Sequence, residues 1–266
     1  GTTGWPAGEP EATHLLNSVL YVSIYDEGVA RWDMASGQAL TTWSTTNWLP
    51  SDRVRSFAVE GTRLLMPTED AGVARYDYSG QFWLGTWNTG NGLASNDVHG
   101  VVVANNMVFI LSGSSMQEYD PVMGSMGSPV AISTFGLPRD GLDVFLWPSM
   151  GERSPSVPWV MVSDGTGDFI ALDTSGQSWS WTSILLASGP SGFDMSDVIE
   201  VGQVVWVAVG DNIDRFDLTA YQWLSPIALG ETATKLSSAG NTIWVGTEEG
   251  GLIEIDGATA SINNTI

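Results

Sequence analysis

The sequence predicts an all-β fold, and three observations lead to that prediction. The 266 residues include 13 Trp and 31 Gly, which is typical of strands joined by tight turns. No stretch keeps an apolar period of 3.6 residues, so almost no helix is expected. A strand–turn–strand pattern closing on Asp recurs six times, at Asp33, Asp77, Asp120, Asp173, Asp217 and Asp256. We therefore predict a six-bladed β-propeller of four-stranded antiparallel blades, with seven blades as the less favoured alternative.

The repeat is clearest in LYVSIYDEGVARWD (20–33) and LLMPTEDAGVARYD (64–77). The closing Asp residues are spaced by 44, 43, 53, 44 and 39 residues, a period typical of propeller blades. The longest spacing comes from an insertion at 148–158, between the first two strands of the fourth repeat. Each repeat also has a strand upstream, as at 54–59 and 98–103, and a strand downstream that often carries Trp, as at Trp43 and Trp87.

The ends of the chain bear on how the propeller closes. The last repeat has a short polar candidate for its fourth strand at 261–266, but we expect the segment 2–5, which includes Trp5, to supply that strand instead. The chain opens on Gly1 without Met or a signal peptide. We therefore expect residues 1–266 to be one propeller domain, cut from a larger protein with flanking domains.

Composition and charge exclude several classes of protein. The absence of Cys excludes a disulfide framework, a thiolate zinc site and a Cys nucleophile, and two His leave little for a His zinc site. No GxSxG motif is present. The chain also contains no run of 18 apolar residues, the length that a membrane-spanning helix requires. The net charge of −21 argues against nucleic acid and anionic lipid as partners. It suits a cationic protein partner or divalent ions, or simply keeps the protein dissolved in salt.

Three segments resemble the two-component-regulator propeller repeat. They are LPSDRVRSFAVEGTRLLMPTEDAGVARYD (49–77), NTIWVGTEEGGLIEID (241–256) and GLASNDVHGVVV (92–103). In that family such propellers are similar to the extracellular sensor regions of membrane receptors, often linked to polysaccharide detection. The resemblance implies an extracellular or cell-surface location and a sensor-like role.

Candidate ligand-binding residues come from the predicted face over the central channel. That face is built from the loops that lead into each first strand and from the turns between second and third strands. Charged or aromatic residues in those loops and at the starts of first strands are Trp48, Asp52, Arg55, Asp97, His99, Asp140, Asp143, Asp197 and Lys235. A mixed ring of charges could recognise a polar ligand. Equally, the innermost strands of a propeller face water and take polar residues for that reason alone.

The predicted turns between second and third strands are mostly acidic. The segment DGTGD at 164–168 alternates oxygen donors, so Asp164 and Asp168 are candidate calcium ligands. Asp and Gly also simply make good turns, which explains the same residues without a metal. Among the tryptophans, Trp48 and Trp147 precede Pro-containing segments, and we expect them to be exposed and able to stack on sugars.

The favoured function is a non-catalytic, extracellular ligand-binding or protein-interaction module that is sensor-like. Its ligand would be an oligosaccharide or a cationic protein. The alternative is a carbohydrate-active hydrolase or lyase with its site at the channel mouth, using paired carboxylates or His99 with Arg55. A structural spacer without any ligand is a third possibility.

Overall fold

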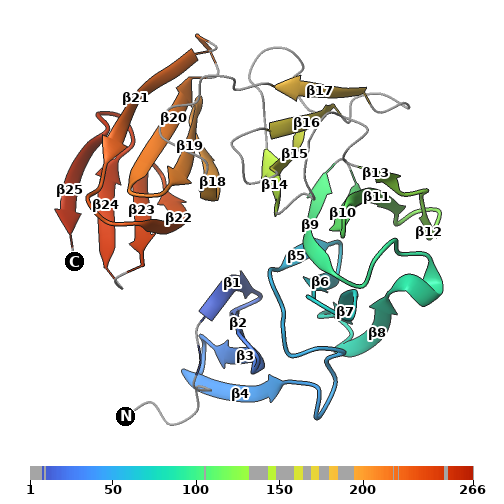
Figure 1. Ribbon diagram of the computed structural model, residues 1–266. Coiled ribbons are helices and arrows are strands. Elements are labelled where there is room, and N and C mark those ends of the chain that lie inside the picture. Colours follow the sequence, from blue (N-terminus) through green and yellow to red (C-terminus); the bar gives the residue numbers. More distant parts are fainter. Residues whose placement is uncertain are drawn as a thin grey trace. The chain divides into compact units, whose positions relative to one another are not determined.

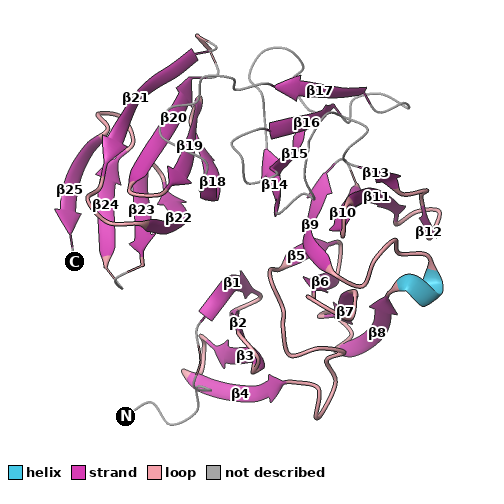
Figure 2. Ribbon diagram, viewed as in Figure 1, coloured by secondary structure: helices cyan, strands magenta, loops and turns pink. Residues whose placement is uncertain are grey.

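The structure is a computed structural model, and it describes residues 8, 10–104, 106–131, 143–147, 159–163, 169–173, 180–184, 195–217, 219–220, 222–248 and 251–265. The chain divides into two compact units, Gly1–Val144 and Phe145–Ile266. Strands dominate both units (Figure 1). The helical element of the described chain is one short 3-10 turn, η1 (Thr89–Asn91), coloured cyan in Figure 2. No described helix is long and apolar enough to cross a membrane.

The first unit contains three antiparallel sheets, each built from strands that follow one another along the chain. The first sheet has β1 (Pro10–Leu16), β2 (Val19–Ile24), β3 (Gly28–Asp33) and β4 (Gln38–Trp43). The second has β5 (Ala58–Glu60), β6 (Arg63–Pro67), β7 (Val73–Asp77) and β8 (Phe82–Trp87). The third has β9 (Val98–Ala104), β10 (Met107–Ser112), β11 (Ser115–Asp120), β12 (Ser125–Met126) and β13 (Val130–Ala131).

The remaining strands form three further sheets of four strands each. The first has β14 (Asp143–Trp147), β15 (Trp159–Ser163), β16 (Phe169–Asp173) and β17 (Ser180–Ile184). The next has β18 (Met195–Val201), β19 (Val204–Val209), β20 (Asn212–Asp217) and β21 (Gln222–Ala228). The last has β22 (Ala233–Ala239), β23 (Thr242–Thr247), β24 (Leu252–Asp256) and β25 (Ser261–Thr265). The predicted insertion at 148–158 lies between β14 and β15, outside the described residues.

The prediction of four-stranded antiparallel blades is confirmed, but the prediction of six such blades is wrong. Five of the described sheets have four strands, and the third sheet does not. There the fourth strand is split, because β12 pairs with the end of β11 and β13 pairs with its beginning. The segment Gly127-Ser128-Pro129 separates the two pieces, and Pro has no N–H to donate to a neighbouring strand.

Residues 2–5, which were expected to supply the fourth strand of the last sheet, lie outside the described residues. The fourth strand of the last sheet is β25, which pairs with β24 through the short turn 257–260. A strand that follows immediately loses far less chain entropy on pairing than one more than 250 residues away.

All six predicted closing Asp residues end the third strand of their sheet. In the sheets where the side chain is described, the carboxylate accepts hydrogen bonds from backbone N–H groups two or three residues later, as Asp33 does from Ala35 and Ser36. Such bonds hold the pKa of the Asp77 and Asp256 carboxyls below the ordinary range, and the pKa of the Asp33 carboxyl is lowered first by the Ser36 hydroxyl and then by the backbone N–H groups. The recurring Asp therefore shapes the turn into the fourth strand.

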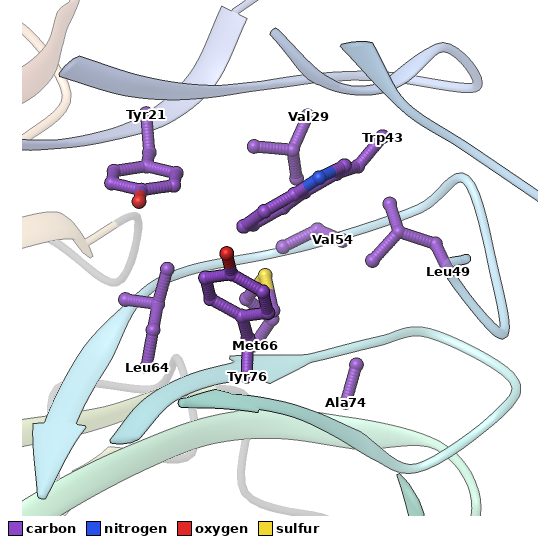
Figure 3. Close-up of a cluster of buried hydrophobic side chains, with 9 residues drawn as sticks. All are labelled: Tyr21, Val29, Trp43, Leu49, Val54, Leu64, Met66, Ala74 and Tyr76. Atoms are coloured by element: carbon purple, nitrogen blue, oxygen red, sulfur yellow. The ribbon is translucent and has the colours of Figure 1, made fainter. Parts of the chain in front are cut away.

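The core of the first unit lies between successive sheets. Figure 3 shows Tyr21, Val29 and Trp43 of the first sheet facing Leu64, Met66 and Tyr76 of the second. The ring centroids of Trp43 and Tyr76 are 4.6 Å apart. Trp87 occupies the corresponding position against the third sheet, with its ring centroid 4.2 Å from that of Tyr119. The tryptophan that ends each of these fourth strands thus packs onto the next sheet, which buries a large aromatic surface.

Candidate functional site

A register irregularity recurs at the start of the first strand in the sheets whose first-strand pairing is described. In β9, Val98 pairs with Ser112 and Gly100 pairs with Leu111, so His99 is an extra residue in a β-bulge. In the second sheet Val54 forms a bridge with Thr68, and the backbone N–H of Arg55 donates to the carbonyl of Pro67. Val54 and Val98 are both buried, which anchors Arg55 and His99 directly after them. A bulge interrupts the alternation of side chains between the two faces of a strand and so redirects one side chain. Here it redirects Arg55 and His99 in two adjacent sheets.

These two bulge residues meet. Arg55 Nη1 donates to His99 Nδ1 at 2.7 Å, and Arg55 Nη2 lies 3.2 Å from Asp97 Oδ1. A guanidinium has only donors, so His99 Nδ1 must accept, and the proton of the neutral ring sits on Nε2. His99 Nε2 is 3.7 Å from Asp97 Oδ2. The other carboxylate oxygen, Asp97 Oδ1, forms the ion pair with Arg55. It is buried and receives no hydrogen bond from the described residues.

A second arginine, Arg53, lies two residues before Arg55 in the same loop. Its guanidinium forms an ion pair with Asp26 in the β2–β3 turn and lies 3.5 Å from Glu69 in the β6–β7 turn. It also stands over the ring of Tyr25, with its central carbon 5.2 Å from the ring centroid. The Asp26 side-chain contact raises the pKa of Arg53 further, so this group stays charged. We call Asp26, Arg53, Arg55, Glu69, Asp97 and His99 the charged cluster.

The loops that lead into the second and third sheets are built alike. Asn47 and Asn91 each accept a hydrogen bond from the backbone N–H three residues earlier, and each donates to a carbonyl of the preceding strand. Asp52 accepts from both the N–H and the hydroxyl of Thr45, each at 2.6 Å. The predicted ligand-binding carboxylate of Asp52 is therefore engaged in holding its own loop.

Of the nine predicted ligand-binding residues, the structure brings Arg55, Asp97 and His99 together. Trp48 lies in the loop before Arg53 with 53% of its surface exposed, as expected for that residue. Asp143 and Trp147 lie in β14, whose backbone alone is described, and Asp140 lies outside the described residues. The calcium candidates Asp164 and Asp168 lie outside them as well. In the part of the chain that is described, no three His, Asp or Glu side chains are grouped to hold a metal ion.

Asp197 and Lys235 belong to the second unit, where the bulges are used differently. Asp197 Oδ2 accepts from the N–H of Leu236 at 2.9 Å, which ties β18 to β22. Burial raises the pKa of the Asp197 carboxyl, while Lys235 and two backbone N–H groups oppose that rise. The bulge residues of this unit, Ser196 and Thr234, donate their hydroxyls to backbone carbonyls. These contacts are structural, whereas Arg55 and His99 of the first unit contact each other.

Arg53 and Tyr25 were not among the residues predicted from the sequence. A signal was present, because SDRV at 51–54 and SNDV at 95–98 occupy the same place before their first strands. Arg53 and Asp97 are therefore equivalent positions carrying opposite charges. The equivalence becomes visible only when the two loops are aligned on the buried Val54 and Val98, and the burial of these residues is a property of the folded chain.

No protein-family model matches the sequence, and no curated protein matches it. Solved structures do resemble it. The extracellular domain of a protein described as the hybrid two-component system BT3049 of B. thetaiotaomicron matches 96% of the chain with a TM-score of 0.70 and 13% identity. The extracellular domain of the one-component system BT4673 of the same organism matches 99% with a TM-score of 0.74 and 14% identity.

The chain spans 34% and 36% of the lengths of those two domains. A computationally designed protein, Ika8, also matches 91% of the chain with a TM-score of 0.63 and 14% identity, so the shared architecture does not by itself carry a function. The predicted resemblance to two-component-regulator propellers is confirmed at the level of the fold: the chain is an all-β propeller of four-stranded antiparallel blades, like the extracellular domains of these bacterial two-component-type proteins.

Proposed function

We propose that the chain is a non-catalytic, sensor-like binding module that works outside the cell and holds a hydroxyl-rich ligand, such as an oligosaccharide, at the charged cluster. The observation that carries the proposal is the contact between Arg55, Asp97 and His99, in which Arg55 and His99 hold equivalent positions of adjacent sheets. The likeness to extracellular domains supports the location and the sensor-like role.

The cluster offers what recognition of a sugar needs. Guanidinium donors and carboxylate acceptors alternate, and their ion pairs hold each side chain in place before a ligand arrives, which lowers the entropic cost of binding. Tyr25 and Trp48 are exposed aromatic rings on the loops and turns around the cluster, and such rings stack on sugar faces.

The contact geometry favours binding over catalysis. A general base needs a free lone pair within reach of the substrate. The Nδ1 lone pair of His99 accepts from Arg55, and the His99 side chain is only 12% exposed. Arg55 and His99, the candidate catalytic residues of a lyase, are therefore hydrogen-bonded to each other.

A cationic protein is the second candidate partner. The exposed acidic turn that contains Asp26 and Glu27, together with the net charge of −21, favours it. An oligosaccharide fits the mixed donors and acceptors of the cluster better than a purely cationic surface does.

The test is a binding titration of neutral and charged oligosaccharides, with each sugar analysed afterwards for cleavage. We expect Arg55→Ala to weaken binding at least tenfold, since a charge-assisted hydrogen bond contributes about 1.5–3 kcal/mol. Arg63→Ala is the matched control, because Arg63 pairs with Glu60 at the opposite end of the same sheet. Equal loss in both variants, or no binding to any sugar, would refute the proposal, and shortened sugars would reveal an enzyme.

A further inference from the structure

Building on the proposed function, we infer that the charged cluster selects its ligand by charge, accepting amino-bearing and neutral sugars and rejecting sugars that carry carboxylate or sulfate groups. The inference starts from what the two arginines already contact. Arg53 is paired with both Asp26 and Glu69, and Arg55 with Asp97. Neither guanidinium is left to receive an anion in the usual bidentate way.

The charge balance of the cluster is negative. It has three carboxylates and two guanidiniums, and the tautomer of His99 that accepts from Arg55 is neutral. Glu27 and Asp70 are exposed in the same two turns and add to the negative potential. An anionic sugar would therefore approach against the local field.

Two of the three carboxylates, those of Asp26 and Asp97, are better exposed than the guanidiniums they contact, whereas the Glu69 side chain is 34% exposed against 39% for Arg53. The side chains of Asp26 and Asp97 are 54% and 46% exposed, against 39% and 29% for Arg53 and Arg55. A ligand that enters the cluster meets acceptor oxygens before it meets guanidinium donors.

An aromatic ring completes the arrangement. Tyr25 is exposed and directly precedes Asp26, and Arg53 stands over its ring. Arg53 covers one face of the Tyr25 ring, so an ammonium group would be attracted to the neighbouring Asp26 carboxylate and to the part of the ring that stays exposed. The expected order of affinity is therefore amino sugar, then neutral sugar, then acidic sugar.

The experiment compares three β-1,4-linked tetramers that differ in charge: glucosamine, glucose and mannuronate. Calorimetric titrations are run at low and at high NaCl concentration. We expect the glucosamine tetramer to bind about tenfold more tightly than the glucose tetramer at low salt, and this gap to shrink in high salt as screening increases. We expect no measurable binding of the mannuronate tetramer.

Two matched variants separate the cluster from the charge of the whole chain. Glu69→Gln removes a carboxylate of the cluster, and Glu60→Gln removes one that pairs with Arg63 at the far end of the same sheet. The glucosamine preference should fall several-fold in Glu69→Gln and stay unchanged in Glu60→Gln. Equal effects of the two substitutions would attribute the preference to net charge and overturn the inference.

The outcomes for the inference and for the proposed function differ. Mannuronate binding as tightly as glucose would overturn charge selection and leave the binding module standing. If none of the three tetramers binds, the proposed sugar-binding function fails, and the inference fails with it.

Discussion

At the scale of single residues, the recurring GVAR segment can be explained position by position. Gly28 and Gly72 have φ of +87° and +95°, and a Cβ atom there would lie 2.2 and 2.0 Å from the carbonyl oxygens of Trp43 and Trp87. Three residues later, Arg31 and Arg75 stand over the rings of those same tryptophans. Arg31 also donates to the carbonyl of Thr41. The motif therefore fastens the third strand to the fourth and has no direct part in the site.

This account predicts the cost of a methyl group at Gly72. Gly72→Ala should lower the free energy of unfolding by roughly 2–4 kcal/mol, because the left-handed backbone and the Trp87 carbonyl both oppose a Cβ atom. Gly61→Ala is the control, since Gly61 has φ of +56° with open space around it, and should cost about 1 kcal/mol. Denaturant titration measures both, and equal losses would contradict the steric part of the argument.

At the scale of the element, the turn between third and fourth strands depends on an ionised Asp. The folded pKa of Asp77 is depressed by hydrogen bonds from Gly80 and Thr62. A depressed pKa stabilises the fold at pH above the unfolded value of about 3.9, and that stabilisation is lost as pH falls through the folded pKa. Acid should therefore loosen these turns.

Asp77→Asn tests this sign. Asn keeps an acceptor oxygen but cannot be protonated in this range, so stability should fall less steeply below about pH 4 than in the parent chain. Asp70→Asn removes the same charge from an exposed turn of the same sheet and serves as the control. Unfolding curves recorded across the acid range measure the slopes, and a slope unchanged by Asp77→Asn would disprove the role of this carboxylate.

Strands and turns were predictable from the sequence where the same residue types recur at the same spacing. Gly, Asp and Trp at fixed spacings predicted the hairpins and the ends of all six third strands. The split fourth strand of the third sheet was not predicted, although Gly127 and Pro129 are visible in the sequence, because whether the chain resumes pairing after Pro129 depends on contacts with β11. The bulges at Arg55 and His99 depend on pairing with a neighbouring strand, which no local pattern records.

At the scale of the whole molecule, excess negative charge is the dominant feature. A net charge of −21 makes like charges repel one another in the folded state, and salt screens that repulsion. The melting temperature should therefore rise by several degrees between about 0.01 M and 1 M NaCl, where the Debye length shrinks from about 30 Å to about 3 Å. A melting temperature that falls or stays constant would contradict this view.

The same melts, repeated in CaCl₂ at matched ionic strength, test the predicted calcium ligands. Screening alone gives equal shifts for the two salts, whereas an ion bound only to the folded chain adds a further rise. If that extra rise survives the double substitution of Asp164 and Asp168 by Asn, the calcium prediction is wrong.

The sequence alone determined the repeat, the strand order within each blade and the turn chemistry, because each depends on residues close together in the chain. It also identified Arg55, Asp97 and His99 as members of the candidate site. Only the tertiary structure decided that these three side chains contact one another, that Arg53 joins two acidic turns, and that Asp52 and Asp197 hold backbone instead of facing a ligand. The physical reason is that these contacts join residues of different loops, strands and sheets, and their geometry is set by how the backbone bulges and packs.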